Sequence, residues 1–257
     1  MQWFFSLNSV LQAFIASIFT YFMTALGASL IFFSKKVNGR FLTAMMGGAA
    51  GIMIAASFFS LLLPAIEYNT PIPTYIVVTT GFLLGGAFIV GSDLFLNKIN
   101  SLQGGAGRKS ALLYSAVTLH NLPEGMAVGV AFASVAAGDT AGVVSALMLA
   151  LGIGIQNFPE GVCVAYPLKA LGYGNLKAFF FAQASGIVEI LGAVLGAVAV
   201  GFIRGLMPWT LSFSAGAMIA VVCSELIPDC FEQNKITASF GIILGFAVMM
   251  LLDLALG

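Results

Sequence analysis

Charged residues are scarce in this chain. Only 8% of its 257 residues are Asp, Glu, Lys or Arg, whereas 60% are hydrophobic and the mean hydropathy is +1.05. Soluble domains carry about 25% charged residues, so the composition excludes a water-soluble protein and indicates an all-α integral membrane protein. The net charge is zero, which gives no basic surface for nucleic acid.

Histidine and cysteine are also rare. The chain has one histidine, His120, and three cysteines, Cys163, Cys223 and Cys230, with no CxxC pair. The cysteines therefore indicate neither a disulfide framework nor a thiolate metal site. A single histidine argues against an intramembrane metalloprotease, which needs a pair such as HExxH. Cys163 and Cys223 fall inside apolar runs, where we expect buried, inert thiols.

Apolar runs long enough to cross a bilayer, about 20 residues, occur eight times. We expect spans at Val10–Phe33, Phe41–Ile66, Ile76–Leu96, Ser110–Ala136, Ala141–Tyr166, Ala178–Ile203, Trp209–Ile227 and Ile236–Leu256. The connections between them are short, so residues 1–257 are expected to form one polytopic membrane domain. The first run has no basic flank and no cleavage site, which favours a retained span over a signal peptide.

The basic residues orient these spans. Nine of the ten Lys and Arg residues lie in the loops after the first, third, fifth and seventh spans, and only Arg204 lies on the other side. Cytoplasmic loops carry the excess of Lys and Arg. Both termini are therefore expected to be non-cytoplasmic.

An internal repeat relates the first three spans, about 10–96, to the last three, about 178–256. Ala50-Gly-Ile-Met-Ile-Ala55 recurs as Ala215-Gly-Ala-Met-Ile-Ala220, and Leu26-Gly-Ala recurs as Leu191-Gly-Ala. Residues 81–96 of the third span match 241–256 of the eighth in the same way. Five spans separate partners, so each pair crosses the membrane in opposite senses. This 3+2+3 inverted repeat is typical of secondary transporters, and it leaves the central spans, about 110–166, between the two halves.

Those two central spans carry related hexapeptides, His120-Asn-Leu-Pro-Glu-Gly125 and Gln156-Asn-Phe-Pro-Glu-Gly161. Each hexapeptide places a polar side chain four residues before a glutamate, on one face of a helix. Each proline lacks an N–H, so it frees the backbone carbonyl one turn earlier. Carboxylates in the middle of a membrane helix are costly and are interpreted as functional by default.

A third carboxylate, Glu189, lies in the middle of the sixth span, and no Lys or Arg is available at this depth. Unpaired buried carboxylates need a cation or protons. Imidazole, carboxylate and amide ligands suit Zn²⁺, Fe²⁺, Mn²⁺ or Cd²⁺, and Glu124 and Glu160 are able to bridge two ions. His120, Asn121 and Asn157 also have a simpler interpretation as interhelical hydrogen-bonding residues. Glu225 is either a pathway residue or an interfacial one.

These residues resemble the ZIP (Zrt/Irt-like) family of divalent-metal transporters, and the resemblance covers the whole chain. Its most specific element is His-Asn-x-Pro-Glu-Gly, while the Gln-Asn-x-Pro-Glu-Gly of the fifth span is similar to the GufA-like branch. The resemblance implies one metal held by His120, Glu124, Gln156 and Glu160, and a second held by Asn121, Asn157, Glu189 and the bridging glutamates. Some relatives have Asp at position 157, so the Asn of this chain lowers the charge of the second site.

The resemblance also implies zinc transport into the cytoplasm, with iron, manganese and cadmium as further cargo, by a homodimer that is not an enzyme. We expect it in the lipid bilayer of a prokaryotic inner membrane. The metal is transported substrate rather than a cofactor. Two alternatives stay open from the residues alone, a cation channel and a proton-coupled carrier for another small solute.

Overall fold

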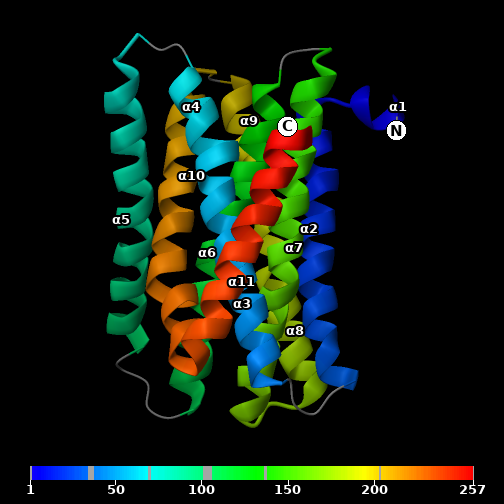
Figure 1. Ribbon diagram of the computed structural model, residues 1–257, viewed down its shortest axis with the longest axis vertical. Coiled ribbons are helices and arrows are strands. Elements are labelled where there is room, and N and C mark those ends of the chain that lie inside the picture. The colour runs from blue at the N-terminus through cyan, green and yellow to red at the C-terminus, as the bar shows by residue number, and fades with distance from the viewer. Residues whose placement is uncertain are drawn as a thin grey trace.

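The computed structural model describes the backbone of residues 2–33, 38–68, 71–100, 106–135, 138–202 and 204–256. The side chains of residues 2, 96–97, 99–100, 106–117, 119–120, 170, 201–202, 204 and 256 lie outside that description. All regular elements in the described ranges are helical. Figure 1 shows a bundle of long helices whose two chain termini lie at the same end.

The first part of the bundle runs up to the third long helix. Its elements are α1 (Gln2–Phe5), α2 (Ser9–Phe33), α3 (Gly39–Ala56), the π-helix η1 (Ser57–Leu62), α4 (Leu63–Glu67) and α5 (Thr74–Asn100). Two helices with internal prolines follow, α6 (Ala106–Ser134) and α7 (Thr140–Ala170). The last part contains α8 (Asn175–Ser185), α9 (Ile187–Phe202), η2 (Arg204–Leu206), α10 (Met207–Val221), the π-helix η3 (Val222–Leu226) and α11 (Ile227–Leu256).

Six stretches of the described helices are long and apolar enough to cross a bilayer. They are Ser9–Phe33, Gly39–Glu67, Thr74–Phe95, Thr140–Lys169, Asn175–Val200 and Met207–Ala255. The expected membrane protein is therefore confirmed, but the count of eight spans is matched only in part. Helix α6 is not among the six, and the seventh and eighth expected spans fall together in Met207–Ala255.

The last of these stretches is too long for one crossing. Its 49 residues would extend about 74 Å as a straight helix, more than twice the hydrocarbon thickness of about 30 Å. The backbone of Asn234 is non-helical, with φ −162° and ψ 102°, and its side-chain oxygen accepts a hydrogen bond from the N–H of Thr237 at 3.0 Å. This is the geometry of a helix N-cap, so a new helix begins after Asn234.

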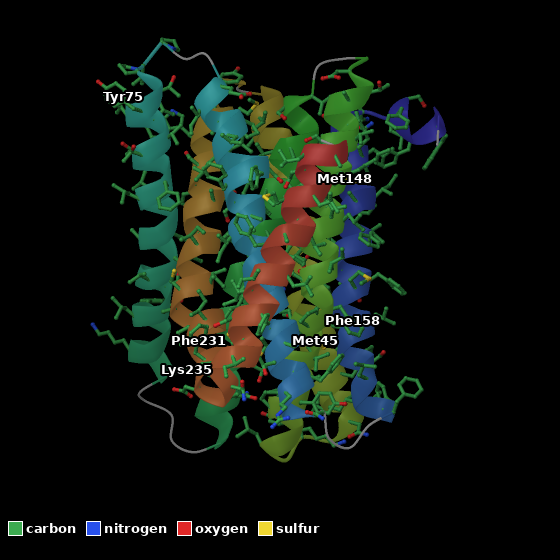
Figure 2. All side chains as sticks on the ribbon, viewed as in Figure 1. Met45, Tyr75, Met148, Phe158, Phe231 and Lys235 are labelled. Atoms are coloured by element: carbon green, nitrogen blue, oxygen red, sulfur yellow. The ribbon has the colours of Figure 1, made fainter. Side chains whose placement is uncertain are left out.

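The outer surface of the bundle is apolar. Large side chains such as Phe22, Leu83, Ile243 and Leu254 are more than half exposed, and Figure 2 shows such side chains projecting from the outer helices between Tyr75 at one end and Lys235 at the other. Exposed apolar side chains over the length of a helix are unfavourable in water. They fit a surface that faces lipid.

Glycines bring the helices into backbone contact. A Cβ on Gly27 of α2 would overlap the carbonyl oxygen of Phe158 in α7, and a Cβ on Gly192 of α9 would meet the carbonyl oxygen of Leu122 in α6 at 2.6 Å. Small residues let membrane helices approach closely. The repeat in the sequence equates Gly27 with Gly192, and the hexapeptides equate Phe158 with Leu122.

The same correspondence holds between the outer helices. Gly51 of α3 contacts the carbonyl oxygen of Ile242 in α11, and Gly216 of α10 contacts that of Phe82 in α5. The π-helices η1 and η3 also begin at residues that the repeat equates, Ser57 and Val222. Equivalent segments of the two halves therefore have the same local structure and make the same type of contact.

These contacts predict the effect of adding one methyl group. Gly216→Ala should destabilise the protein by about 1–3 kcal/mol, because its Cβ overlaps backbone atoms that have no room to move. Gly91→Ala is the matched control, since no atom lies within 4 Å of its Cβ position. The measurement is the thermal unfolding midpoint of each purified protein in detergent. Equal midpoints for the two variants would contradict the packing described for α5 and α10.

Candidate metal centre

Helices α6 and α7 place the two hexapeptides inside the bundle. Both helices continue through their prolines, Pro123 and Pro159, and they pack against each other. A proline inside a helix leaves the carbonyl four residues earlier without its usual partner. The polar side chains and the freed carbonyls therefore lie in the same part of the bundle.

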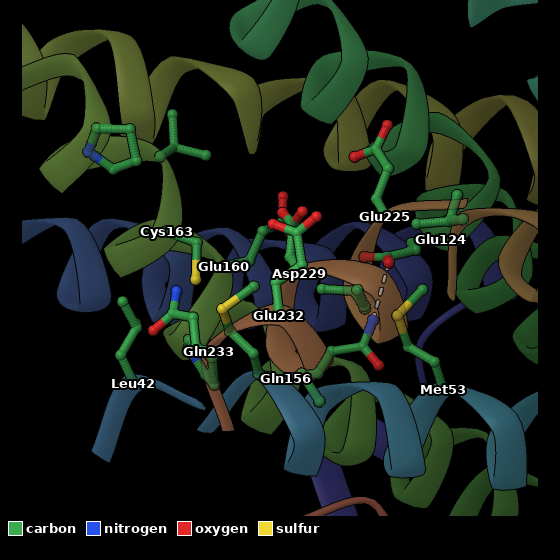
Figure 3. Close-up of a pocket in the computed structure, with 17 residues that line it drawn as sticks. Leu42, Met53, Glu124, Gln156, Glu160, Cys163, Glu225, Asp229, Glu232 and Gln233 are labelled. Carbon is green, nitrogen blue, oxygen red and sulfur yellow. Dashed lines mark hydrogen bonds between the residues drawn. The ribbon is translucent and has the colours of Figure 1, made fainter. Parts of the chain in front are cut away.

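One group of candidate metal ligands joins α6 and α7. The side-chain nitrogen of Gln156 donates a hydrogen bond to Oε1 of Glu124 at 2.8 Å. Glu124 and Gln156 are buried, with 3% and 2% of their surfaces exposed, and Glu160 is half-buried. Figure 3 shows this hydrogen bond and the carboxylates of Glu124 and Glu160 around the same hollow.

A second group joins α2, α7 and α9. The side-chain nitrogen of Asn157 donates to Oε2 of Glu189 at 2.7 Å and approaches the backbone oxygen of Thr20 at 3.3 Å. The hydroxyl of Thr24 donates to Oε1 of Glu189 at 3.4 Å. Asn157 and Glu189 are completely buried, so both oxygens of a fully enclosed carboxylate accept hydrogen bonds from protein groups.

Several buried oxygens of the predicted ligands have no hydrogen-bond partner. They are Oδ1 of Asn121, Oε2 of Glu124, Oε1 of Gln156, Oδ1 of Asn157 and Oε1 of Glu160. A buried polar atom without a partner is unfavourable by about 1–3 kcal/mol, and native proteins pair nearly all such atoms or use them to bind an ion. Five unpartnered oxygens on two adjacent helices are therefore suited to a cation.

A cavity of about 360 Å³ reaches this group. Glu124, Gln156 and Glu160 line it together with side chains of α3, η3 and α11. Its wall also contains Glu225, Asp229 and Glu232, which Figure 3 shows around the same hollow. Glu232 lies three residues before Lys235, which Figure 2 places at the end of the bundle opposite the termini. The cavity thus leads from the donors toward that end.

The structure brings most of the sequence-predicted residues together. Asn121, Glu124, Gln156, Asn157, Glu160 and Glu189 are all buried or half-buried around α6 and α7, and Glu225 lies in the cavity wall. The side chain of His120 lies outside the described residues. Among the described side chains, no three His, Cys, Asp or Glu residues are grouped closely enough to hold a metal by themselves.

The expectation of buried cysteines is wrong for Cys223 and matched only in part for Cys163. Cys223 is exposed rather than buried, because it lies in η3, on the side of that helix turned away from the core. Cys163 is half-buried and lines the cavity, because it follows Glu160 by one turn of α7 on the same face.

Sequence reasoning missed four residues of the site and its approach. Two of them are Asp229 and Glu232. Their spacing from Glu225, which the sequence did identify, is that of residues on one helix face, and this was a usable signal. Thr20 and Thr24 contact the Asn157–Glu189 pair, and the repeat equates Thr24 with Glu189. That correspondence was the available signal for Thr24.

Comparison with known proteins identifies relatives of this chain. The profile of the family described as "ZIP Zinc transporter" matches residues 98–253. The chain is 34% identical to the zinc transporter ZIP11 of Homo sapiens, over 97% of this chain and 98% of the relative. It is 37% identical to the zinc transporter GufA of Myxococcus xanthus, over 95% and 98% of the two chains. It is 39% identical to the zinc transporter ZIPB of Bordetella bronchiseptica, over 91% and 78%. This chain therefore belongs to the ZIP family of zinc transporters, which are not enzymes.

Proposed function

We propose that this protein carries zinc across the membrane into the cytoplasm, with iron, manganese and cadmium as further divalent cargo. The observation that carries the proposal is the set of unpartnered buried oxygens at the inner end of the cavity, on Glu124, Gln156 and Glu160. A cation supplies the positive charge that this group needs. The printed names of the relatives support zinc as that cation.

The proposed ligands are His120, Glu124, Gln156 and Glu160 for one ion. His120 lies four residues before Glu124, and Gln156 four residues before Glu160, a spacing typical of ligands on one face of a helix. Nitrogen and carboxylate donors without a thiolate suit Zn²⁺ and its neighbours in the first transition row. Asn157 and Glu189, which are hydrogen-bonded to each other, are proposed together with Asn121 as the second donor group. Glu225 is proposed as a residue of the pathway, since it lines the same cavity.

The proposed architecture has eight spans in a 3+2+3 inverted repeat. The helix break at Asn234 supports two crossings within Met207–Ala255, and α6, with 29 residues, is long enough for another. The equivalent glycine contacts and the paired π-helices support the repeat. In such transporters the substrate binds between the halves, and α6 and α7 occupy that place.

The proposed orientation follows from the basic residues. Arg40, Lys98, Lys169, Lys177 and Lys235 belong to the ends of helices away from the chain termini, and that end is cytoplasmic by the rule for Lys and Arg. The termini are then non-cytoplasmic, and the cavity opens to the cytoplasm. We further propose a homodimer in a prokaryotic inner membrane, on the basis of the family resemblance.

The first test is removal of one carboxylate. Glu124→Ala and Glu160→Ala should abolish zinc uptake into vesicles containing the purified protein, because each removes a ligand and leaves its neighbours unsatisfied. Glu67→Gln is the control, since Glu67 is exposed at the end of α4. Each variant must elute as a folded protein in detergent. Normal uptake by either alanine variant would contradict the assigned site.

The second test is pH. Protons and metal compete for the same imidazole and carboxylate atoms, and metal ligands must be deprotonated to bind. With equal pH on both sides of the vesicle membrane, zinc uptake should fall about tenfold between about pH 7 and about pH 5, across the range in which histidine titrates. An unchanged rate would contradict a site built from these groups.

The third test distinguishes a carrier from a channel. Leu42 lines the cavity, whereas its repeat equivalent, Met207, is only 9% exposed. Single cysteines at these positions, in a chain without Cys163, Cys223 and Cys230, are labelled with a membrane-impermeant thiol reagent. A carrier exposes the two halves alternately, so zinc should change the two labelling rates in opposite directions. Changes in the same direction would favour a channel.

A further inference from the structure

We propose that this chain carries one metal ion at a time, at the Glu124–Gln156–Glu160 end of the cavity, and that the amide of Asn157 closes the second donor group to metal. The inference rests on the proposed function and concerns how many ions the site holds. It departs from the binuclear centre that the family resemblance implies, and it makes Asn157 a residue that determines the metal content of the transporter.

Glu189, the carboxylate of the second donor group, is satisfied without an ion. Both oxygens of Glu189 accept hydrogen bonds, Oε2 from Asn157 at 2.7 Å and Oε1 from Thr24 at 3.4 Å. Glu189 is completely buried and no oxygen of its carboxylate is left unpartnered. Glu124 and Glu160 differ, because each keeps one buried oxygen without a partner.

The second group is also separated from the cavity. Glu124, Gln156 and Glu160 line the cavity, but its wall contains neither Asn157 nor Glu189. Both residues are fully enclosed between α2, α7 and α9, and the close backbone contacts of Gly161 with Thr24 and of Gly125 with Glu189 seal their surroundings. An ion entering from the cavity therefore meets the first group and not the second.

The chemistry of residue 157 explains why the carboxylate of Glu189 needs no metal ion. The amide N–H₂ of Asn157 faces the carboxylate of Glu189, and the reverse orientation would bring two oxygens together. The N–H thus supplies the positive end of a dipole where a cation would otherwise lie. An aspartate in its place would put two carboxylates within hydrogen-bonding distance in a buried site, an arrangement that requires a cation or a proton.

The repeat explains why the second group has only one carboxylate. Residue 24 in α2 is equivalent to residue 189 in α9, so the first half provides a threonine where the second half provides a glutamate. The hydroxyl of Thr24 then serves as a donor to Glu189. One half therefore supplies the carboxylate and the other supplies its hydrogen-bond donor.

The test counts zinc ions per chain. Purified full-length protein in detergent is dialysed against buffered Zn²⁺, and bound metal is measured by mass spectrometry. The wild type should bind about one ion per chain, and Asn157→Asp should bind about two, because the substitution replaces the donor amide by a second carboxylate. Asn8→Asp is the matched control with the same change of charge. Asn8 caps α2 through the N–H of Leu11, and aspartate caps equally well, so this variant should stay at one.

A double variant identifies the location of the added ion. Asn157→Asp combined with Glu189→Gln should return to one ion per chain, because the second site then has lost one of its two carboxylates. Two ions in the wild type, or a ratio of one in Asn157→Asp, would overturn the role proposed for Asn157. Two ions in the double variant would place the added ion elsewhere and would also overturn it. A wild type that binds no zinc would instead contradict the metal site itself.

Discussion

Buried carboxylates without a basic neighbour are the constraint on which the rest of this structure depends. Glu124 and Glu189 are almost completely enclosed, and no Lys or Arg occurs between residues 110 and 168 of the chain. An unpaired charge is very unfavourable inside a bundle surrounded by lipid. Amide and hydroxyl donors satisfy the carboxylate of Glu189. Glu124 and Glu160 each keep a buried oxygen without a partner, which a cation is able to satisfy.

Close helix packing makes this arrangement possible. Donors on separate helices converge on one ion only where the backbones approach within contact distance, and glycine is the residue that allows such contact. Gly125 lies against the backbone of Glu189, and Gly161 lies against that of Thr24. The last residue of each hexapeptide therefore positions the helix that completes the second donor group. The glycines and the glutamates of the two motifs act together for this reason.

Repeat-related segments give the protein two similar halves, and the halves differ at residues of the candidate site. Equivalent glycines and equivalent π-helices preserve the framework. Thr24 and Glu189 are equivalent positions with different side chains. The cavity wall likewise contains Glu225, Asp229 and Glu232 from the second half, which gives one part of the cavity an acidic lining.

The sequence by itself determined that this is a helical membrane protein of the ZIP family, the approximate helix positions and nearly all of the ligand candidates. It did so because apolar length, the Lys and Arg distribution and the paired hexapeptides are local properties of the chain. Only the tertiary structure decided which donors face the cavity and which face each other. Asn121, Glu124 and Glu160 retain unpartnered oxygens, whereas Glu189 is satisfied by Asn157 and Thr24. These partners are 32 and 165 residues from Glu189 in the sequence, and contacts at such separations depend on helix packing that no local pattern specifies.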